Sequence, residues 1–246
     1  MDQVILILVI AAFGASALQS ATGIGFGVIA GPVLLIALND GSAIQISVLL
    51  NLLIALLLAP SLWQQFDRRL LKILVVGLAI GSPLGLTIYL HMNIALLKLF
   101  AGLTVLLTLI MMLRGNRASS TVQTAASGTV ERISVGIVAG IMGGSLAMPG
   151  PVPAAWMSAR GFDKKTIRAT ILVMFISAYS IALVLQISLA GISAETMKLT
   201  AMLVPSTIAG IIVGNFLSSR VSETIFRWLL TSILLFTAIF LFATID

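Results

Sequence analysis

Two glycine- and proline-rich stretches carry the residues best suited to bind a ligand. The first runs from Gly23 to Val33, and the second runs from Gly143 to Pro153. Prolines inside a helix remove backbone donors and clash with the preceding turn, so the second stretch, with Pro149, Pro151 and Pro153, cannot continue as a regular helix. The first stretch is related to it in glycine and proline content. The free N–H groups at a helix start, or of successive glycines, bind anions. The pattern therefore predicts a small oxyanion clasped between two opposed half-helices, one from each stretch.

Small polar groups near these stretches would complete the binding shell. They are hydroxyl, amide, indole and guanidinium side chains close to the interruptions or along the next apolar segments. The predicted substrate-binding residues are Gln19, Ser20, Thr22, Gly23, Gly25, Gly27, Pro32, Asn51, Gly143, Gly144, Ser145, Pro149, Gly150, Pro151, Trp156 and Arg168.

Each of these residues also has a structural interpretation. Serine and threonine in membrane helices commonly bond their own backbone. Asn51 would serve as a polar contact between helices, Trp156 as an interfacial anchor, and Arg168 as part of a basic cluster that sets topology. The alternative for the two stretches is a pair of kinked helices.

The remaining reactive residues do not form a catalytic or metal-binding set. All eight acidic residues lie at the ends of apolar segments or in loops, His91 is the single histidine, and cysteine is absent. No metal site, cofactor or enzymatic activity is predicted from these residues. Coupling through a buried carboxylate is disfavoured, whereas coupling through backbone carbonyls stays open.

The composition is that of a protein embedded in a lipid bilayer. The chain of 246 residues is 59% hydrophobic and 9% charged, and its mean hydropathy is +1.17. Apolar runs long enough to cross a membrane recur throughout. The net charge of +6 comes from Lys and Arg at segment ends, which fits membrane topology rather than nucleic-acid binding.

The sequence predicts an all-α integral membrane protein with ten apolar segments in one domain, residues 1–246. Repeat one (1–113) and repeat two (131–246) would each hold about five segments, joined by a cytoplasmic linker (114–130). The second segment of each repeat is too short to span the bilayer unaided. The expected segments are Val4–Ala21, Gly25–Leu38, Ala43–Leu62, Leu70–Leu90, Ile94–Leu113, Arg132–Ala147, Pro151–Arg160, Thr166–Leu189, Met197–Leu217 and Thr224–Ala243.

Sequence similarity and charge indicate that the two repeats have inverted topology. Leu96–Phe100 aligns with Ile225–Leu229, and Gly81 and Gly85 align with Gly210 and Gly214, where helix packing is the favoured role. Basic residues mark the loops near Arg68, Arg114, Arg160 and Arg220 as cytoplasmic. Both termini would then be extracytoplasmic, and corresponding segments would run in opposite directions.

The glycine pattern resembles that of a known transporter family. The stretch Gly23-x-Gly25-x-Gly27-x-x-x-Gly31-Pro32-x-Leu34, its partner from Gly143-Gly144 to Pro151, and the later repeated glycines are similar to the TauE/SafE sulfite exporter family. The resemblance covers nearly the whole chain. It implies a multi-pass permease of the bacterial or archaeal plasma membrane for sulfur-containing anions such as sulfite, thiosulfate or organosulfonates.

The expected function is therefore export of a small sulfur-containing anion by alternating access about a midplane site. The expected partners are the anion and the lipid bilayer, with no nucleic acid, and the sequence is compatible with a homo-oligomer. A channel-like anion pore, a coupled importer of organic anions and an accessory membrane subunit are the alternatives.

Overall fold

The chain folds into a bundle of helices. The computed structural model describes residues 2–23, 26–114, 128–217 and 223–244. These residues form ten α-helices and one 3-10 turn, with no strand, so the all-α prediction is confirmed. Six of the helices are long and apolar enough to cross a membrane. The elements are α1 (Asp2–Thr22), α2 (Phe26–Leu38), α3 (Ser42–Leu58), η1 (Ala59–Leu62), α4 (Arg68–His91), α5 (Ile94–Arg114), α6 (Thr129–Leu146), α7 (Pro151–Ala159), α8 (Lys164–Leu189), α9 (Ala194–Leu217) and α10 (Glu223–Ala243).

Two helices are short, as their sequences predict. α2 has 13 residues and α7 has 9 residues. At about 1.5 Å per residue, neither can cross a hydrocarbon core of about 30 Å. The third segment runs from Ser42 to Leu62, which agrees with its predicted range of Ala43–Leu62, but its last four residues form η1 instead of continuing α3. Pro60 lies in the first turn of η1 and has no N–H to donate to the preceding helix.

Glycine stripes allow two helix pairs to approach closely. α4 packs along α6, and α1 packs along α9. A Cβ on Gly81 of α4 would lie 2.0 Å from the carbonyl oxygen of Ile137, and one on Gly214 of α9 would lie 2.1 Å from that of Ala17. Since real Cβ atoms do not come so close to an oxygen, both positions require glycine. The packing role predicted for the repeated glycines is therefore confirmed.

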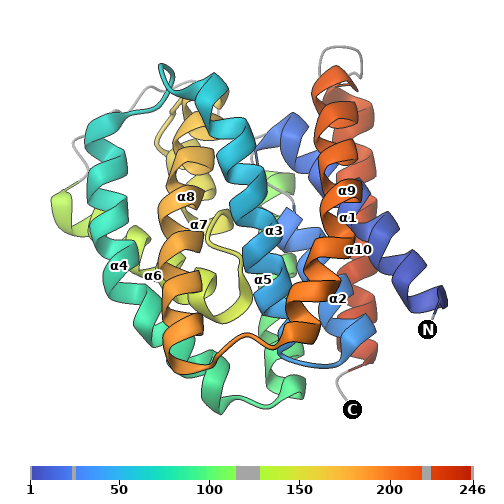
Figure 1. Ribbon diagram of the computed structural model, residues 1–246. Coiled ribbons are helices and arrows are strands. Elements are labelled where there is room, and N and C mark those ends of the chain that lie inside the picture. Colours follow the sequence, from blue (N-terminus) through green and yellow to red (C-terminus); the bar gives the residue numbers. More distant parts are fainter. Residues whose placement is uncertain (1, 24–25, 115–127, 218–222, 245–246) are drawn as a thin grey trace.

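Each of these pairs joins one helix from each half of the chain. α3 packs against α8, and α5 packs against α10, so the halves interlock instead of forming separate bundles (Figure 1). By their order in the two halves, α1 corresponds to α6 and α4 corresponds to α9. The pairs α1–α9 and α6–α4 are therefore equivalent, which is the arrangement expected of two related repeats. The inverted orientation of the repeats remains a prediction.

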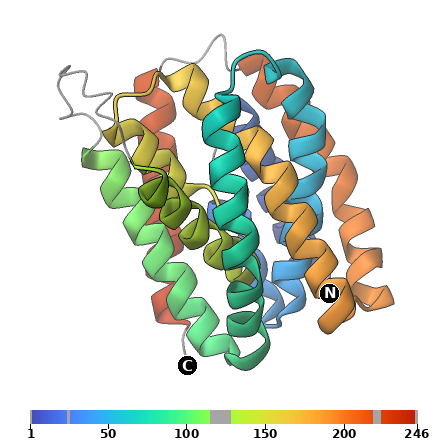
Figure 2. The ribbon, with the colours of Figure 1, turned by 90° about the vertical axis from the view of Figure 1, so that its left-hand side faces the viewer.

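The bundle has two distinct ends. One end, here called the basic face, holds the starts of α4 and α8, with Arg68, Lys72, Lys164 and Lys165. The opposite end, called the vestibule face, holds the turns between α2 and α3, α4 and α5, and α8 and α9. The start of α1 and the end of α10 also lie toward this end (Figures 1 and 2). The linker residues 115–127 and Arg220, used above as topology markers, lie outside the described residues.

Candidate functional site

The first interruption, here called the first break, separates Thr22 at the end of α1 from Phe26 at the start of α2. The chain leaves α1 at Gly23, whose φ of +85° favours glycine. The Gln19 side chain reaches across the break, and its Oε1 accepts a hydrogen bond of 2.8 Å from the backbone N–H of Phe26. Gln19 thereby satisfies one of the free donors at the start of α2.

Arg168 of α8 packs onto the same break. A Cβ on Gly23 would lie 2.6 Å from Cγ of Arg168, so glycine also leaves room for this side chain. The guanidinium Nη2 donates a hydrogen bond of 2.5 Å to the carbonyl oxygen of Ser20, and Nε is buried without a partner. The structure thus joins a partly buried cation to the last turn of α1.

The second break comprises residues 147–150, between Leu146 at the end of α6 and Pro151 at the start of α7. Ala147 has the left-handed φ of 57° that often ends a helix. Its carbonyl oxygen accepts a hydrogen bond of 3.1 Å from the Tyr179 hydroxyl of α8. Gly150 leaves space for the ring of Phe175, because a Cβ there would lie 2.8 Å from that ring. α8 therefore contacts both breaks.

The two breaks meet at the first turn of α2. A Cβ on Gly27 would lie 2.4 Å from the carbonyl oxygen of Ala147 and 3.6 Å from Nδ2 of Asn51. One turn later, a Cβ on Gly31 would lie 3.4 Å from the Met148 side chain. Residues more than one hundred positions apart in the sequence are thus in contact, as expected of a binding site formed by both halves.

Two buried amides beside this meeting point retain unpartnered atoms. Gln19 and Asn51 are both 0% exposed. Nε2 of Gln19 and Oδ1 of Asn51 have no hydrogen-bond partner, although Nδ2 of Asn51 donates to the Ser47 carbonyl oxygen at 2.8 Å. An unpartnered buried polar group costs about 1–3 kcal/mol. One spare donor and one spare acceptor therefore lie in the interior, beside the first turn of α2.

Three predicted site residues lie in the helices beside the breaks and offer no side-chain ligand. Gly143 faces the Pro149 ring, which would lie 3.2 Å from a Cβ at this position. Pro151 is buried in the first turn of α7, and Pro32 is buried inside α2. Gly25 lies outside the described residues.

The hydroxyl groups of three predicted residues bind backbone carbonyls. Thr22 donates to Leu18 at 2.8 Å, Ser145 donates to Ile141 at 2.7 Å, and Ser20 donates to Ile211 of α9 at 3.0 Å. Their hydroxyl hydrogens are thus used in helix backbone or helix packing contacts.

Two further predicted residues lie away from the meeting point. Trp156 donates its indole N–H to Glu131 at 2.7 Å, and Arg160 forms an ion pair with the same carboxylate. This cluster joins the start of α6 to the end of α7 at the basic face. Gly144 faces α4, where a Cβ would lie 2.6 Å from the carbonyl oxygen of Ser82, so its position is one of helix packing.

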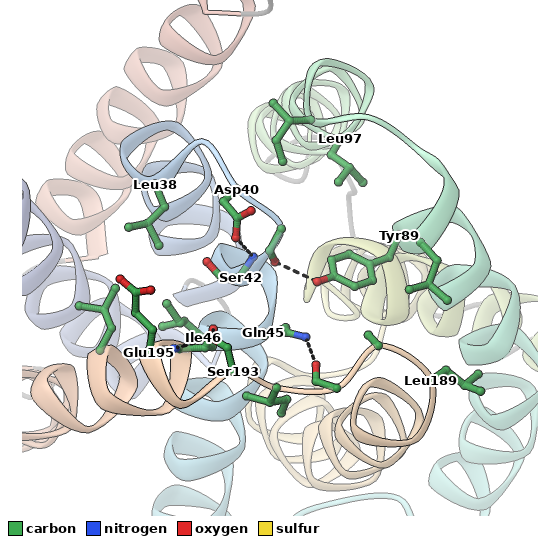
Figure 3. Close-up of a pocket in the computed structure, with 18 of the residues that line it drawn as sticks. Leu38, Asp40, Ser42, Gln45, Ile46, Tyr89, Leu97, Leu189, Ser193 and Glu195 are labelled. Carbon is green, nitrogen blue, oxygen red and sulfur yellow. Dashed lines mark hydrogen bonds between the residues drawn. The ribbon is translucent and has the colours of Figure 1, made fainter.

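A cavity of about 1000 Å³ opens at the vestibule face, and we call it the vestibule (Figure 3). The turns between α2 and α3, α4 and α5, and α8 and α9 surround it. Gln45 donates to the Gly191 carbonyl oxygen at 2.8 Å, and Tyr89 donates to that of Gly41 at 3.2 Å, so these turns are tied to the helices (Figure 3).

The charged groups that line the vestibule are acidic. Asp40 and Glu195 line it, and no Lys or Arg is among its lining residues in the part of the chain that the structure describes. Hydrogen bonds from the backbone and side chain of Ser42 hold the pKa of Asp40 below its usual value. Asp40 is therefore negatively charged at neutral pH.

Sequence reasoning did not assign Gln45 or Gln186 to the site. Each is a polar side chain inside an apolar segment, which is itself a signal of function or of a specific partner. The vestibule residues Asp40 and Glu195 gave no such signal, because carboxylates at helix ends are common on protein surfaces.

Ten helices in the described residues, six of them able to cross a membrane, define a multi-pass membrane protein. The family described as Sulfite exporter TauE/SafE matches residues 8–241, so the chain belongs to the TauE/SafE family of membrane transporters. No curated protein and no solved structure matches the chain.

Proposed function

We propose that this protein exports small sulfur-containing anions, such as sulfite, thiosulfate or organosulfonates, from a bacterial or archaeal cell. The observation that carries the proposal is the meeting of the two breaks beside the buried, incompletely bonded amides of Gln19 and Asn51. Family membership supports the class of substrate.

In this proposal the anion binds at the meeting point of the breaks. The Gln19 Nε2 group donates to an anion oxygen, and the start of α2 adds backbone donors and a positive dipole end. The Asn51 Oδ1 group accepts a hydrogen bond. A singly protonated anion such as hydrogensulfite can use both side chains, because it carries negative oxygens and one hydrogen. Arg168 attracts the anion at the basic-face side of the first break.

The distribution of charge supports outward movement of the anion. The basic face would lie in the cytoplasm, where Arg and Lys concentrate anions, and the acidic vestibule would open outside, together with both termini. An inside-negative potential drives an anion outward by about 2.3 kcal/mol per charge per 100 mV. Export of an anion therefore needs no coupling ion.

Alternating access would arise from movement of the helix groups around the breaks. The interlocked pairs α4–α6 and α1–α9 are held by backbone-to-backbone glycine contacts, which suits them to move as rigid units. The contacts between the breaks are fewer and involve single residues, so they are the natural place for rearrangement.

Flux through purified protein tests the proposal directly. The protein would be reconstituted in liposomes, and labelled sulfite, thiosulfate and an organosulfonate would be followed under an imposed potential. The expected result is saturable flux that follows the potential without a proton or Na⁺ gradient. Flux that requires either gradient would instead indicate coupled transport, and linear flux without saturation would indicate a pore. Absence of flux for all three anions would contradict the proposed function.

The substitution Gln19→Glu tests the site. Glutamate keeps an oxygen to accept from Phe26 N–H, but it replaces the spare donor with a negatively charged oxygen. We expect flux to fall more than about tenfold while the protein stays folded. The matched control is Gln64→Glu, since Gln64 is exposed beyond the end of η1. Equal flux in the two variants would exclude the Gln19 amide from the anion site.

A further inference from the structure

Gln186, close to the vestibule end of α8, has an amide group that the proposed central site does not use. Its side chain is 0% exposed, and neither Nε2 nor Oε1 has a hydrogen-bond partner. Among the described side chains, no other amide has both polar atoms buried and unpartnered. Buried polar groups in folded proteins are nearly always hydrogen-bonded. We therefore expect this amide to bind a partner that is not part of the protein.

Gln186 lies on the same face of α8 as Arg168 and Tyr179, and this line of side chains points inward. Gln186 follows Arg168 by eighteen residues, which is five turns at about 3.6 residues per turn. Tyr179 lies between them, three turns after Arg168 and about 20° off the line. The other side of the helix faces outward, because Val184 is 62% exposed and Ile187 is 56% exposed. One inward line of α8 thus carries a guanidinium, a phenol and an amide.

This line runs from the basic face past both breaks and toward the vestibule. Arg168 binds the first break through the Ser20 carbonyl, and Tyr179 binds the second break through the Ala147 carbonyl. Gln186 is about 10 Å further along the helix than Tyr179. Its own carbonyl accepts from the N–H of Gly191, which lines the vestibule. Gln186 therefore lies at a level between the breaks and the vestibule.

The opposite wall at this level is formed by α3. Gln45 of α3 lines the vestibule and binds the Gly191 carbonyl, so α3 and the end of α8 are held together here. Asn51 is six residues further into α3, beside the breaks. The buried amide side chains of Gln45, Asn51 and Gln186, and the hydroxyl of Ser47 between the first two, carry no charge.

We propose that Gln186 is a second anion-binding position, the outer position, which an oxyanion such as a sulfonate or sulfite occupies between the central site and the vestibule. This inference rests on the proposed function. The Nε2 group donates to the anion, and Oε1 accepts from its hydrating water. A neutral donor binds an anion more weakly than a guanidinium does, so the anion leaves the outer position readily.

Cysteine labelling tests whether Gln186 lies on an aqueous path. The natural chain has no cysteine, so a single Gln186→Cys substitution gives one reactive thiol. A membrane-impermeant anionic methanethiosulfonate reagent would be applied to the protein in lipid nanodiscs, where both faces are accessible. Gln45→Cys is the control for a vestibule position, and Val184→Cys is the control for an outward position two residues away. We expect Gln186→Cys to react much faster than Val184→Cys, and methanesulfonate to slow that reaction.

Flux measurements separate an anion-binding role from a packing role. Gln186→Leu has similar volume and removes the unpartnered amide, so a residue that only packs would tolerate it with unchanged flux. We expect flux to fall about tenfold, with a larger rise in KM for anion supplied from the vestibule face than from the basic face. Gln186→Asn, which keeps the amide, should retain a larger share of the flux. The thermal unfolding temperature should not fall in Gln186→Leu.

The outcomes distinguish this inference from the proposed function. Labelling of Gln186→Cys no faster than that of Val184→Cys would overturn the outer position even if the natural protein transports sulfur anions. Unchanged flux and KM in Gln186→Leu would do the same. Absence of sulfur-anion flux in the natural protein overturns the proposed function instead, and the labelling result then stands on its own as a test of the aqueous path.

Discussion

Gly27 and Ala147 join the two broken regions of the chain, since a Cβ on Gly27 would lie 2.4 Å from the Ala147 carbonyl oxygen. The contact is between backbones, and glycine is the residue that permits it. The Ala147 carbonyl oxygen also accepts the Tyr179 hydroxyl, so Ala147 cannot move aside without breaking a hydrogen bond. The contact holds the start of α2 against the second break.

Gly27→Ala is therefore expected to separate the breaks. The added methyl group forces a shift of the backbone, and anion flux should fall by more than about tenfold in the liposome assay. The matched control is Gly14→Ala in α1, where nothing lies within 4 Å of an added Cβ. This control should retain normal flux. Full activity in Gly27→Ala would show that the two breaks need not touch during transport.

Tyr179→Phe removes the hydroxyl that binds Ala147 while keeping the ring against Phe175. The buried carbonyl then loses its donor, at a cost of about 1–3 kcal/mol. We expect a lower thermal unfolding temperature and reduced flux. Tyr89→Phe is the control, because it removes a similar bond at the rim of the vestibule, to Gly41. A larger effect from Tyr89→Phe than from Tyr179→Phe on flux would contradict the central role of the second break.

The glycines of α4 and α6 are expected to affect stability before transport. A Cβ on Gly81 would lie 2.0 Å from the Ile137 carbonyl oxygen, so Gly81→Ala must push α4 away from α6. Overpacking of this kind costs about 1–3 kcal/mol, and the thermal unfolding temperature should fall. Ile80→Ala is the control on the same helix, since Ile80 is 53% exposed. An unchanged unfolding temperature in Gly81→Ala would mean that the two helices separate easily.

The sequence predicted the breaks well because prolines and glycines act locally. The short lengths of α2 and α7 and the helix start at Pro151 follow from residues within a few positions of each break. The contact between Gly27 and Ala147 could not be predicted in this way. It depends on how distant helices pack, and the sequence indicates only that both residues lie in unusual segments.

Packing between distant helices also explains why some predicted site residues lie away from the meeting point of the breaks. Gly144 belongs to the glycine stripe of α6, and only the position of α4 identifies it as a packing residue. Trp156 lies more than one turn into α7, which runs toward the basic face, so its indole meets Glu131. The amide of Gln186 was visible as a polar group in an apolar segment, but its missing partners depend on its neighbours in space.

Substitutions of Arg168 test whether its charge attracts the anion at the basic-face side of the first break. Arg168→Lys keeps a positive charge but loses the planar group that binds Ser20, and Arg168→Met keeps the packing on Gly23 without the charge. If the charge attracts the anion, KM from the basic face should rise more in the Met variant than in the Lys variant. Lys165→Met is the control, because Lys165 is exposed one turn earlier on α8. Equal KM values in Arg168→Met and Lys165→Met would assign Arg168 to topology alone.

The acidic vestibule predicts a difference between the two directions of transport. Asp40 and Glu195 repel anions that approach from the vestibule face, so the double variant Asp40→Asn, Glu195→Gln should raise anion uptake from that face while leaving flux from the basic face nearly unchanged. The increase should be larger at low salt than at high salt, since exposed charges are screened. The Ser42 hydrogen bonds hold the pKa of Asp40 below its usual value, so this charge persists at neutral pH and is lost only in more acidic solution. The stability that Asp40 gains from these bonds is likewise present above its unfolded pKa and disappears as the pH falls through the lower folded value. Flux should be measured in both directions at neutral pH and at two salt concentrations. Equal uptake by the natural protein and the double variant would show that the vestibule charges do not determine the direction of transport.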